Sequence, residues 1–549
     1  MKYIFIIPFL MLTFTLFAQK ENEQEIFKAM QDELHRNKEQ LKIPGIPDLY
    51  FLSYTIGRCQ QFEIAGSLGS IINSYVTPWN SYGGVQLQLG DYTKSSDMTF
   101  NCQTNFQKFP GEPDYDIIRR TFWLSTDKMY KQTLQINAMK NAYLQSNPLS
   151  EEENALKERC AVPTITRMED MNSEFSIDKL YLEDLVKKVS LIFKEYHDIY
   201  NSSVKIDGAN IVFYKTTSEG VVLKLPANYT TLDVSAYIIT EDGERIDDSY
   251  SILVGSPKEL PDFSEIEQGV RKFADHLLKL RTAPVVDQYY NGPVLFRNSA
   301  VSSIFSQNLL KDGVLFAYRK PCTNQIRAKE TLESRMNTKI LDRRLSVFNY
   351  TDLKTYKGHK LMGAYDIDAE GIIPNKEMTL IENGIFKEML NGCVPTLKAP
   401  KSTGSSRFML GYKNGMYATA PGCIHVSTNE GTKEDKMKKE LIKAAKTEGL
   451  DKAYIVYNFS GKSSEVYQVD IKTGKETLVR LAGIGRIKLD DLNHVLKISE
   501  SESVGDFFLH GQILYSMIYP SSLLMRDVEI KKMDVKHKTQ HILTYPLNK

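Results

Sequence analysis

Hydrophobic side chains recur along the first half of the chain at two different spacings. Between 22 and 41, 114 and 144, and 177 and 196 they return every three or four positions, which is typical of amphipathic helices. Shorter runs within 49–92 and 210–254 alternate between apolar and polar residues, as strands with one buried face do. This order of elements predicts an α/β domain with a mixed sheet and packed helices.

The second half of the chain changes to a strand pattern. Residues 264–280 form the last predicted helix of the first domain, and the segment from Ser264 to Glu267 reads as its capping box. Beyond the turn-rich segment 287–293, short β-rich runs separated by Gly and Ser turns dominate. We therefore predict an α+β protein with one domain at 20–285 and a mainly antiparallel, sandwich-like or barrel-like β domain at 286–549.

One hairpin is predicted with a defined turn. Residues 377–382 and 385–390 flank the pair Asn383-Gly384. Asn-Gly supplies the two positive φ angles that a type I′ turn requires, so two antiparallel strands are expected to meet there.

The N-terminus indicates export. Lys2 precedes an apolar run over 3–17 that ends at Ala18-Gln19, and this run is too short to span a bilayer but fits the core of a signal peptide. We predict a signal peptide at 1–18, a periplasmic location, and no membrane association of the mature chain. An uncleaved anchor is the alternative, because Leu16 occupies a position where cleavage prefers a small residue.

Charge and cysteine content limit the partners and the number of disulfides that we expect. The chain holds 69 Lys and Arg against 68 Asp and Glu, so nothing predicts a nucleic-acid partner. Six cysteines in an exported chain of this length allow one or two disulfides at most, and their spacing leaves the pairing open. They are Cys59, Cys102, Cys160, Cys322, Cys393 and Cys423.

Five motifs in a fixed order resemble a known family. An acidic segment at 366–371 precedes the Asn383-Gly384 hairpin, and a Gly-containing loop at 402–407 follows it. Gly-Pro-Val-Leu-Phe at 292–296 and Pro-Ser-Ser-Leu-Leu at 520–524 flank them. The set is similar to the C-terminal half of the TldD/PmbA family, metallopeptidases once called modulators of DNA gyrase. The resemblance implies a two-domain protomer that pairs with a second family member around a cavity where unfolded peptides are cleaved.

The resemblance also implies where zinc would bind, and the ligands are missing there. In the zinc-bearing branch, a His-Glu-x-x-x-His helix follows the Gly-Pro-Val-Leu strand, and a cysteine near the C-terminus completes the site. Here the matching segment 300–310 has neither His nor Cys, no histidine lies between His276 and His359, and no cysteine follows Cys423. Ser, Gln and Asn are poor zinc ligands, so we predict no metal and no catalytic residue in this chain, like the metal-free PmbA-type subunit.

Three other groups of side chains along the chain have the chemistry of possible sites. Cys423 and His425 share a strand face but offer two ligands only, so packing or surface roles are favoured. Asp366, Asp368 and Glu370 alternate and could attract calcium, although a solvated or loop-bracing acidic edge is favoured because the EF-hand spacing is absent. The loop at 404–407 contains serines but no nucleophile elbow.

The sequence therefore predicts a catalytically silent, periplasmic TldD/PmbA-like subunit. It would bind extended or unfolded peptides, by adding them to a sheet edge, and assemble with a zinc-bearing TldD-like subunit, which would carry the zinc. The alternatives are a stand-alone peptide-binding protein, as a homodimer, and an active hydrolase with an unrecognised site. Arg319, Glu382 and Arg407 are the candidate substrate-binding residues, because they lie beside family motifs.

Overall fold

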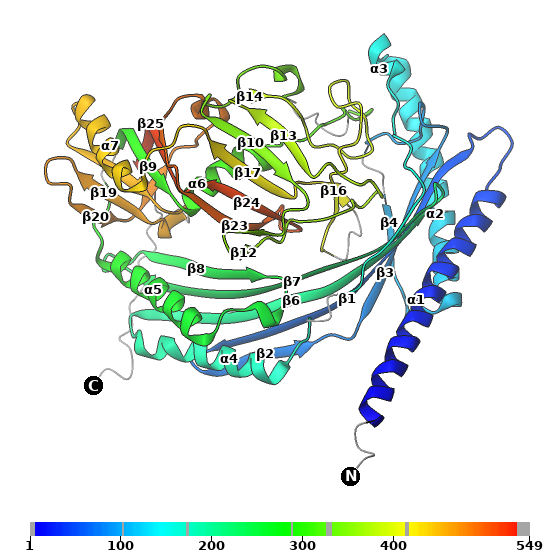
Figure 1. Cartoon of the computed structure of the whole chain (residues 1–549), viewed down its shortest axis with the longest axis horizontal. Helices are drawn as coiled ribbons and strands as arrows, with labels where there is room; N and C mark the ends of the chain where they lie inside the picture. Colours follow the sequence, from blue (N-terminus) through cyan, green and yellow to red (C-terminus); the bar gives the residue numbers. More distant parts are fainter. Residues whose placement is uncertain are drawn as a thin grey trace.

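The computed structural model describes residues 6–100, 104–171, 175–286, 289–324, 332–411, 417–459 and 461–534. Figure 1 shows two layers: a long, curved N-terminal sheet, and a compact C-terminal part that lies on its inner face. Helices α4 (Lys179–Leu191) and α5 (Phe263–Thr282) cover the outer face of the sheet.

The N-terminal sheet has eight strands in the order β4-β3-β1-β6-β7-β5, with β2 paired to β1 and β8 paired to β7. Only β5 pairs in parallel, with β7, so the sheet is mixed. The strands are β1 (Leu49–Ser67), β2 (Ser70–Val76), β3 (Asn80–Leu89), β4 (Thr104–Lys108), β5 (Ile165–Met168), β6 (Ile199–Thr217), β7 (Val221–Ile239) and β8 (Arg245–Val254).

Side-chain alternation along β6 decides what each face of the sheet contacts. Its even-numbered residues, such as Ile206 and Tyr214, pack with α4 and α5 near one end of the strand and with the long N-terminal helices near the other. Its odd-numbered residues, such as Ile211 and Phe213, pack against the C-terminal part. Both faces are buried because successive side chains point to opposite sides. The remaining N-terminal helices are α1 (Ile6–Gln40), α2 (Tyr115–Ser146) and α3 (Glu151–Ala155).

The C-terminal part is built from two larger sheets around one core. One follows the order β14-β13-β10-β17-β24-β23 and the other β20-β19-β18-β9-β25-β21, with β22 paired to β25. Their strands are β9 (Tyr289–Arg297), β10 (Leu345–Tyr350), β13 (Glu377–Glu382), β14 (Ile385–Phe386), β17 (Cys423–Thr428), β18 (Lys452–Val456), β19 (Val466–Asp470), β20 (Glu476–Val479), β21 (Ala482–Ile484), β22 (Val495–Ile498), β23 (Glu502–Leu509), β24 (Ile513–Pro520) and β25 (Ser522–Lys532).

Smaller elements complete the C-terminal part. Two short hairpins, β11–β12 and β15–β16, lie beside the main sheets, and α7 packs on the second sheet. The elements are α6 (Ser299–Phe305), β11 (Thr355–Tyr356), β12 (His359–Lys360), β15 (Ser406–Phe408), β16 (Tyr417–Thr419) and α7 (Glu434–Thr447). The motifs that open and close this part are neighbours, since β9 pairs with β25 through contacts such as Leu295 with Leu524.

The fold class is confirmed: mixed α+β, with a helix-covered N-terminal sheet and a mostly β C-terminal part. The predicted Asn383-Gly384 turn is also confirmed, with φ angles of 46° and 77° between β13 and β14. The first of the strands predicted within 210–254 begins earlier than expected, because β6 extends over 199–217 with alternating burial. The predicted capping box was wrong: α5 begins earlier, and Asp262 caps it by accepting a hydrogen bond from the Glu265 N–H (2.9 Å).

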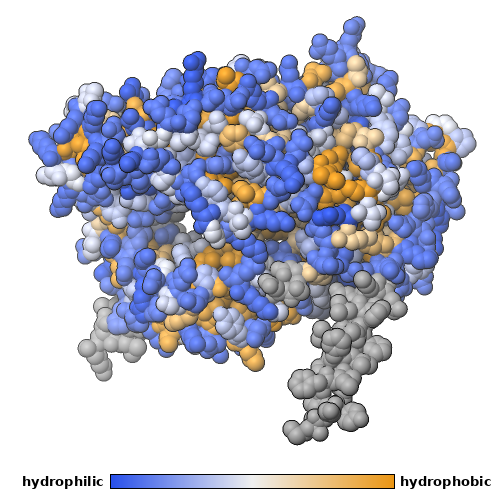
Figure 2. All heavy atoms as spheres, in the orientation of Figure 1, coloured by the Kyte–Doolittle hydropathy of each residue, from blue (hydrophilic) through white to orange (hydrophobic). Residues whose placement is uncertain are grey.

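The N-terminal prediction is not tested. Residues 1–5 of the predicted signal peptide lie outside the described residues, and the described side chains begin at Glu23. Among the described residues, no helix is both long and apolar enough to cross a membrane. Figure 2 shows a mostly hydrophilic face, with hydrophobic groups gathered between the two layers and over α4 and β2, where Ile72 and Leu180 are exposed.

Candidate functional site

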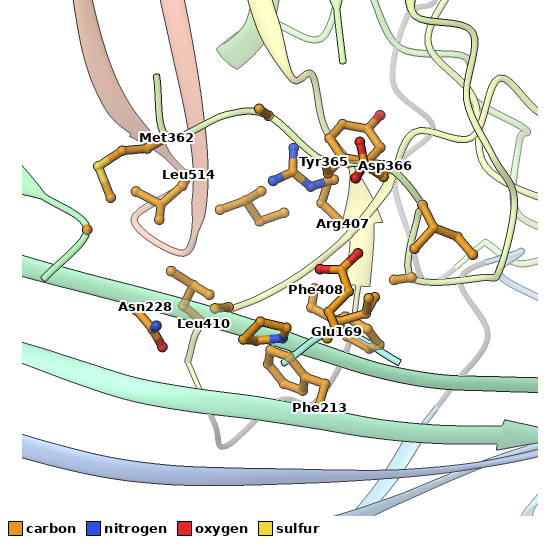
Figure 3. A pocket seen from close by; sticks show the side chains of 18 of the residues that line it. Glu169, Phe213, Asn228, Met362, Tyr365, Asp366, Arg407, Phe408, Leu410 and Leu514 are labelled. Carbon is orange, nitrogen blue, oxygen red and sulfur yellow. The ribbon is translucent and has the colours of Figure 1, made fainter. Parts of the chain in front are cut away.

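A cavity of about 310 Å³ lies where the two layers meet. Residues 225–228 of β7 form one wall, and the loop 360–369 with β15 forms the other. Figure 3 shows side chains from both layers pointing into this space, with Asn228 and Phe213 below and Tyr365 and Arg407 above. The cavity exists only because the C-terminal part closes over the N-terminal sheet.

Aromatic stacking fixes the two walls relative to one another. The rings of Phe213 on β6 and Phe408 on β15 stack at 4.3 Å between centroids, with 12° between their planes. Leu410 and Leu514 extend the same hydrophobic cluster. Stacked aromatic rings bury a large apolar area in a defined geometry, so this contact sets the spacing of the cavity.

Arg407 is one of two cationic side chains that line the cavity, and the other, Lys360, pairs with Glu259 (2.8 Å). Nη1 of Arg407 donates to the carbonyl oxygens of Gly363 (2.9 Å) and Pro421 (3.1 Å), and its guanidinium lies 4.1 Å from the centroid of the Tyr365 ring. No carboxylate of the described residues forms an ion pair with it. Burial lowers the pKa of Arg407, although the charge stays, because the ordinary pKa of arginine is so high. The cavity therefore holds a positive charge that is positioned by backbone carbonyls, and the carboxylates of Asp366 and Glu169 line the same space.

The β7 wall carries an open stretch of sheet edge. On that edge β5 pairs with residues 221–224 and β8 pairs with 230–239, and no strand of the described residues pairs with 225–229 between them. The Glu169 N–H donates to the Lys224 carbonyl on this side (2.9 Å), so the outward backbone groups beyond it belong to Pro226 and Asn228. Proline suits an edge because it has no N–H to leave unpaired. An extended backbone could add here.

The acidic segment at 366–371 confirms one of the two predicted roles. Asp368 and Glu370 are buried in a series of turns, so a solvated edge is wrong for these two residues and the loop-bracing role is right. Asp368 braces the loop by accepting from the N–H groups of Glu370 (2.9 Å), Ile372 (2.8 Å) and Ser406 (3.2 Å). Burial, and then the neighbouring Glu370 carboxylate, raise the pKa of Asp368.

Glu370 joins the two layers through buried charges. Its Oε1 lies 3.1 Å from Nη1 of Arg159, while its Oε2 accepts from the Cys393 N–H (2.7 Å) and the Ser406 hydroxyl (2.6 Å). Lys215 on β6 reaches the same loop and donates to the Ala369 carbonyl (2.7 Å). Burial alone would raise the pKa of Glu370, but Arg159 and Lys215 outweigh it and lower the pKa.

The segment that matches the zinc helix is filled by packing. Residues 300–310 form α6 and a following π-helical turn (Ser306–Lys311), and most of their side chains are buried in the main core. The polar atoms are already in use: Ser306 shares a hydrogen bond with the Tyr515 hydroxyl (2.8 Å), and Asn308 donates to the carbonyls of Ile304 (2.9 Å) and Ile487 (3.2 Å). Neither imidazole nor thiolate is available there, so these residues do not fit zinc.

The other sulfur and nitrogen candidates do not build a metal site. Cys423 and His425 share β17 as predicted, but Cys423 packs with Leu361 and Ile518 while His425 Nε2 lies 2.8 Å from Glu502. Within the described ranges, no group of three or more His, Cys, Asp or Glu side chains is placed to hold a metal ion. A two-member set is too small for a tight transition-metal site.

The three predicted substrate-binding residues lie apart. Arg407 lines the cavity between the layers. Arg319 lines two other hollows of about 480 Å³ each, donates to the Lys157 carbonyl (2.6 Å) and lies 4.4 Å from the Phe100 ring centroid. Glu382 is exposed at the end of the Asn-Gly hairpin, 3.6 Å from Lys387. The structure brings none of them together.

Sequence reasoning missed Arg159 and Lys215. Both come from the N-terminal layer, far in sequence from the family motifs, and both are buried against the acidic loop. Lys215 ends an apolar run on β6, where a lone lysine gives no sign of burial. One signal could have found them: two buried carboxylates need cations nearby. That signal becomes usable only once the loop is known to be buried.

Comparison with known proteins matches the C-terminal part of the chain to a family. Residues 290–532 match the model of the PmbA/TldA metallopeptidase C-terminal domain. Comparison with curated proteins gives no significant match.

Three solved structures share the fold across nearly the whole chain. A candidate modulator of a DNA gyrase from Thermotoga maritima has 13% identity and a TM-score of 0.57, covering 92% of this chain and 100% of its own. TldE from Thermococcus kodakarensis has 12% identity and a TM-score of 0.56, covering 91% and 99%. A candidate modulator of DNA gyrase from Bacteroides thetaiotaomicron has 13% identity and a TM-score of 0.56, covering 93% and 99%. The family match over 290–532 and the shared fold lead to one conclusion: the C-terminal part of this chain belongs to the TldD/PmbA family, and the chain as a whole has the fold of these three structures.

Proposed function

We propose that this chain is a catalytically silent subunit of an exported TldD/PmbA-like peptidase complex, which binds extended peptide and supports a zinc-bearing partner. One observation carries the proposal: the segment 300–310 keeps its place after β9 but offers no zinc ligand, and its polar atoms are bonded within the fold. Zinc chemistry would then belong to the partner subunit, and this chain needs no cofactor of its own.

Peptide binding is supported by the cavity between the layers. The open edge of β7 at 225–229 offers backbone carbonyls and the Asn228 N–H to an added strand. Arg407 lies in the facing wall and supplies a positive charge for a carboxylate or carbonyl of that peptide. Phe213 and Phe408 give apolar surface between these polar groups.

Metal analysis tests the silent role. The purified chain is expected to hold far less than one zinc per molecule after dialysis and to cleave no unfolded peptide. The same measurements on a co-expressed pair with a relative that has the His-Glu-x-x-x-His helix are expected to give zinc and cleavage. Stoichiometric zinc and cleavage by this chain alone would refute the proposal.

Peptide binding is tested with labelled synthetic peptides of unstructured sequence. Replacement Arg407→Gln is expected to weaken binding about tenfold or more, because a charge-assisted hydrogen bond is lost. Arg486→Gln is the matched control, since this arginine has a side chain 69% exposed and pairs with Asp312 instead. Equal affinity of both variants and the wild type would remove Arg407 from the site.

A stand-alone peptide-binding protein is the second candidate. It is favoured if purification from the native host recovers a homodimer without a zinc-bearing relative.

Export is tested in the same cells. Periplasmic recovery with a mature N-terminus at Gln19 supports the proposed signal peptide, and a membrane-bound, uncleaved chain supports the anchor.

A further inference from the structure

Two cysteines from different layers meet beside the Glu370 network. The Cys160 N–H donates to the Cys393 carbonyl (2.8 Å), and both side chains belong to one hydrophobic cluster with Val162 and Ile367. Residues that pair through backbone hydrogen bonds in antiparallel strands have Cα atoms about 5.5 Å apart, and a separation of this size lies within the range that a disulfide requires.

The two side chains are neighbours as well. Interaction with the Cys160 side chain, and then burial, raise the pKa of Cys393. The other described cysteines, Cys59, Cys322 and Cys423, lie in separate clusters that contain no second cysteine. Within the described residues, this pair is therefore the one cysteine contact of the molecule.

We propose that Cys160 and Cys393 form a disulfide bond that cross-links the N-terminal and C-terminal layers. The bond would join the segment that carries Arg159 to the loop whose N–H at Cys393 binds Glu370. It locks the two layers covalently at the point where buried charges already hold them.

The reaction needs a disulfide oxidant such as oxidised glutathione. Cys160 is partly exposed and Cys393 is 1% exposed, so the Cys160 thiolate attacks the oxidant first. A mixed disulfide forms and one glutathione thiolate leaves. Cys393 then gives up its proton and attacks the Cys160 sulfur, which releases the second glutathione. Two protein thiols are oxidised, and one glutathione disulfide is reduced to two thiols.

Oxidation of the purified full-length chain tests this pairing. After incubation with oxidised glutathione, quenching and proteolysis without reductant, mass spectrometry is expected to find a linked peptide pair containing Cys160 and Cys393. The melting temperature is expected to rise by roughly 5 °C relative to the reduced chain. Both signals should disappear in Cys160→Ser and persist in Cys59→Ser.

Cys160 is partly exposed, so its serine variant keeps the test valid if Cys393→Ser fails to fold. Free thiols at both positions after oxidation, or a link from Cys160 to any other cysteine, would overturn the proposal. An equal thermal shift in Cys160→Ser would overturn it too.

Discussion

At the scale of single residues, buried charges at the interface determine how the two layers dock. Glu370 has a side chain 3% exposed and faces Arg159, also 3% exposed, with Glu219 3.7 Å from the same guanidinium. Such groups are costly to bury and are stable only when each charge is paired and hydrogen-bonded. They therefore fix how the C-terminal part docks.

Loss of the Glu370 charge is expected to be costly. Glu370→Gln leaves Arg159 and Lys215 buried with less compensation, so the free energy of unfolding should fall by about 3–5 kcal/mol. Glu377→Gln, at an exposed position, should stay within about 0.5 kcal/mol. Urea unfolding of the three proteins measures this, and equal midpoints would mean that the network contributes nothing.

The stabilisation that the Glu502 carboxylate provides should be lost in acid. Burial raises the pKa of Glu502, but hydrogen bonds from Tyr356 and His425 outweigh it and lower the pKa below the ordinary 4.5. A lowered pKa means that its stabilisation is complete above about pH 4.5 and is lost as the pH falls through the folded-state value. At pH 7 we expect Glu502→Gln to be less stable by about 2 kcal/mol.

Thermal melts from pH 7 to pH 3 check this expectation. The gap between wild type and Glu502→Gln should close at the acid end, whereas the exposed Glu500→Gln should follow the wild type throughout. A gap that stays constant with pH would show that the ionised form of Glu502 is not the stabilising one.

At the scale of elements, turn chemistry and alternation decide the strands. Asn383-Gly384 and Lys357-Gly358 both adopt positive φ angles and close two-residue hairpins. Only the first was predicted, because Asn-Gly is a strong turn signal and Lys-Gly is a weak one. The two turns also differ in how closely the backbone of other segments approaches their glycines.

This difference predicts unequal costs for the same substitution. In Gly384→Ala the new Cβ would lie 2.3 Å from the Leu341 carbonyl oxygen, whereas at Gly358 nothing lies within 4 Å. Both variants bear the left-handed penalty of about 1–2 kcal/mol, and Gly384→Ala should lose clearly more. Chemical denaturation compares them, and identical losses would contradict the close approach at Gly384.

At the scale of the whole molecule, the features that support the proposed function lie where the two layers meet. The cavity, the open edge of β7 and the cysteine pair all lie between the N-terminal sheet and the C-terminal part, as Figure 1 indicates for the sheet and the domain above it. The stack of Phe213 on Phe408 connects the layers through apolar contact alone.

Breaking that stack should loosen the interface. Phe408→Ala is expected to lower the free energy of unfolding by about 3 kcal/mol, because it leaves a cavity beside Phe213. Ile373→Ala, at a side chain 68% exposed, should change stability by no more than about 0.5 kcal/mol. Guanidinium unfolding measures the free energy of unfolding of both variants. If Phe408→Ala lowers it no more than the control does, the aromatic stack does not stabilise the interface.

The sequence alone determined the features that depend on local chemistry. Apolar spacing located the helices at 114–144 and 177–196, and Asn383-Gly384 specified a turn. The motifs between 292 and 524 indicated the family whose model matches the C-terminal part. The lack of His and Cys in the segment 300–310 was also evident from the sequence, because folding cannot supply a side chain that the segment does not contain. These signals act over a few neighbouring positions.

Only the tertiary structure decided what lies inside. The sequence left open whether the segment 366–371 is a solvated or a loop-bracing acidic edge. Asp368 and Glu370 are buried and brace the loop, because Arg159 and Lys215 reach it from the other layer. The contact of Cys160 with Cys393 is equally invisible in the sequence. Burial and pairing between distant segments depend on how the layers dock, and no short-range pattern records that.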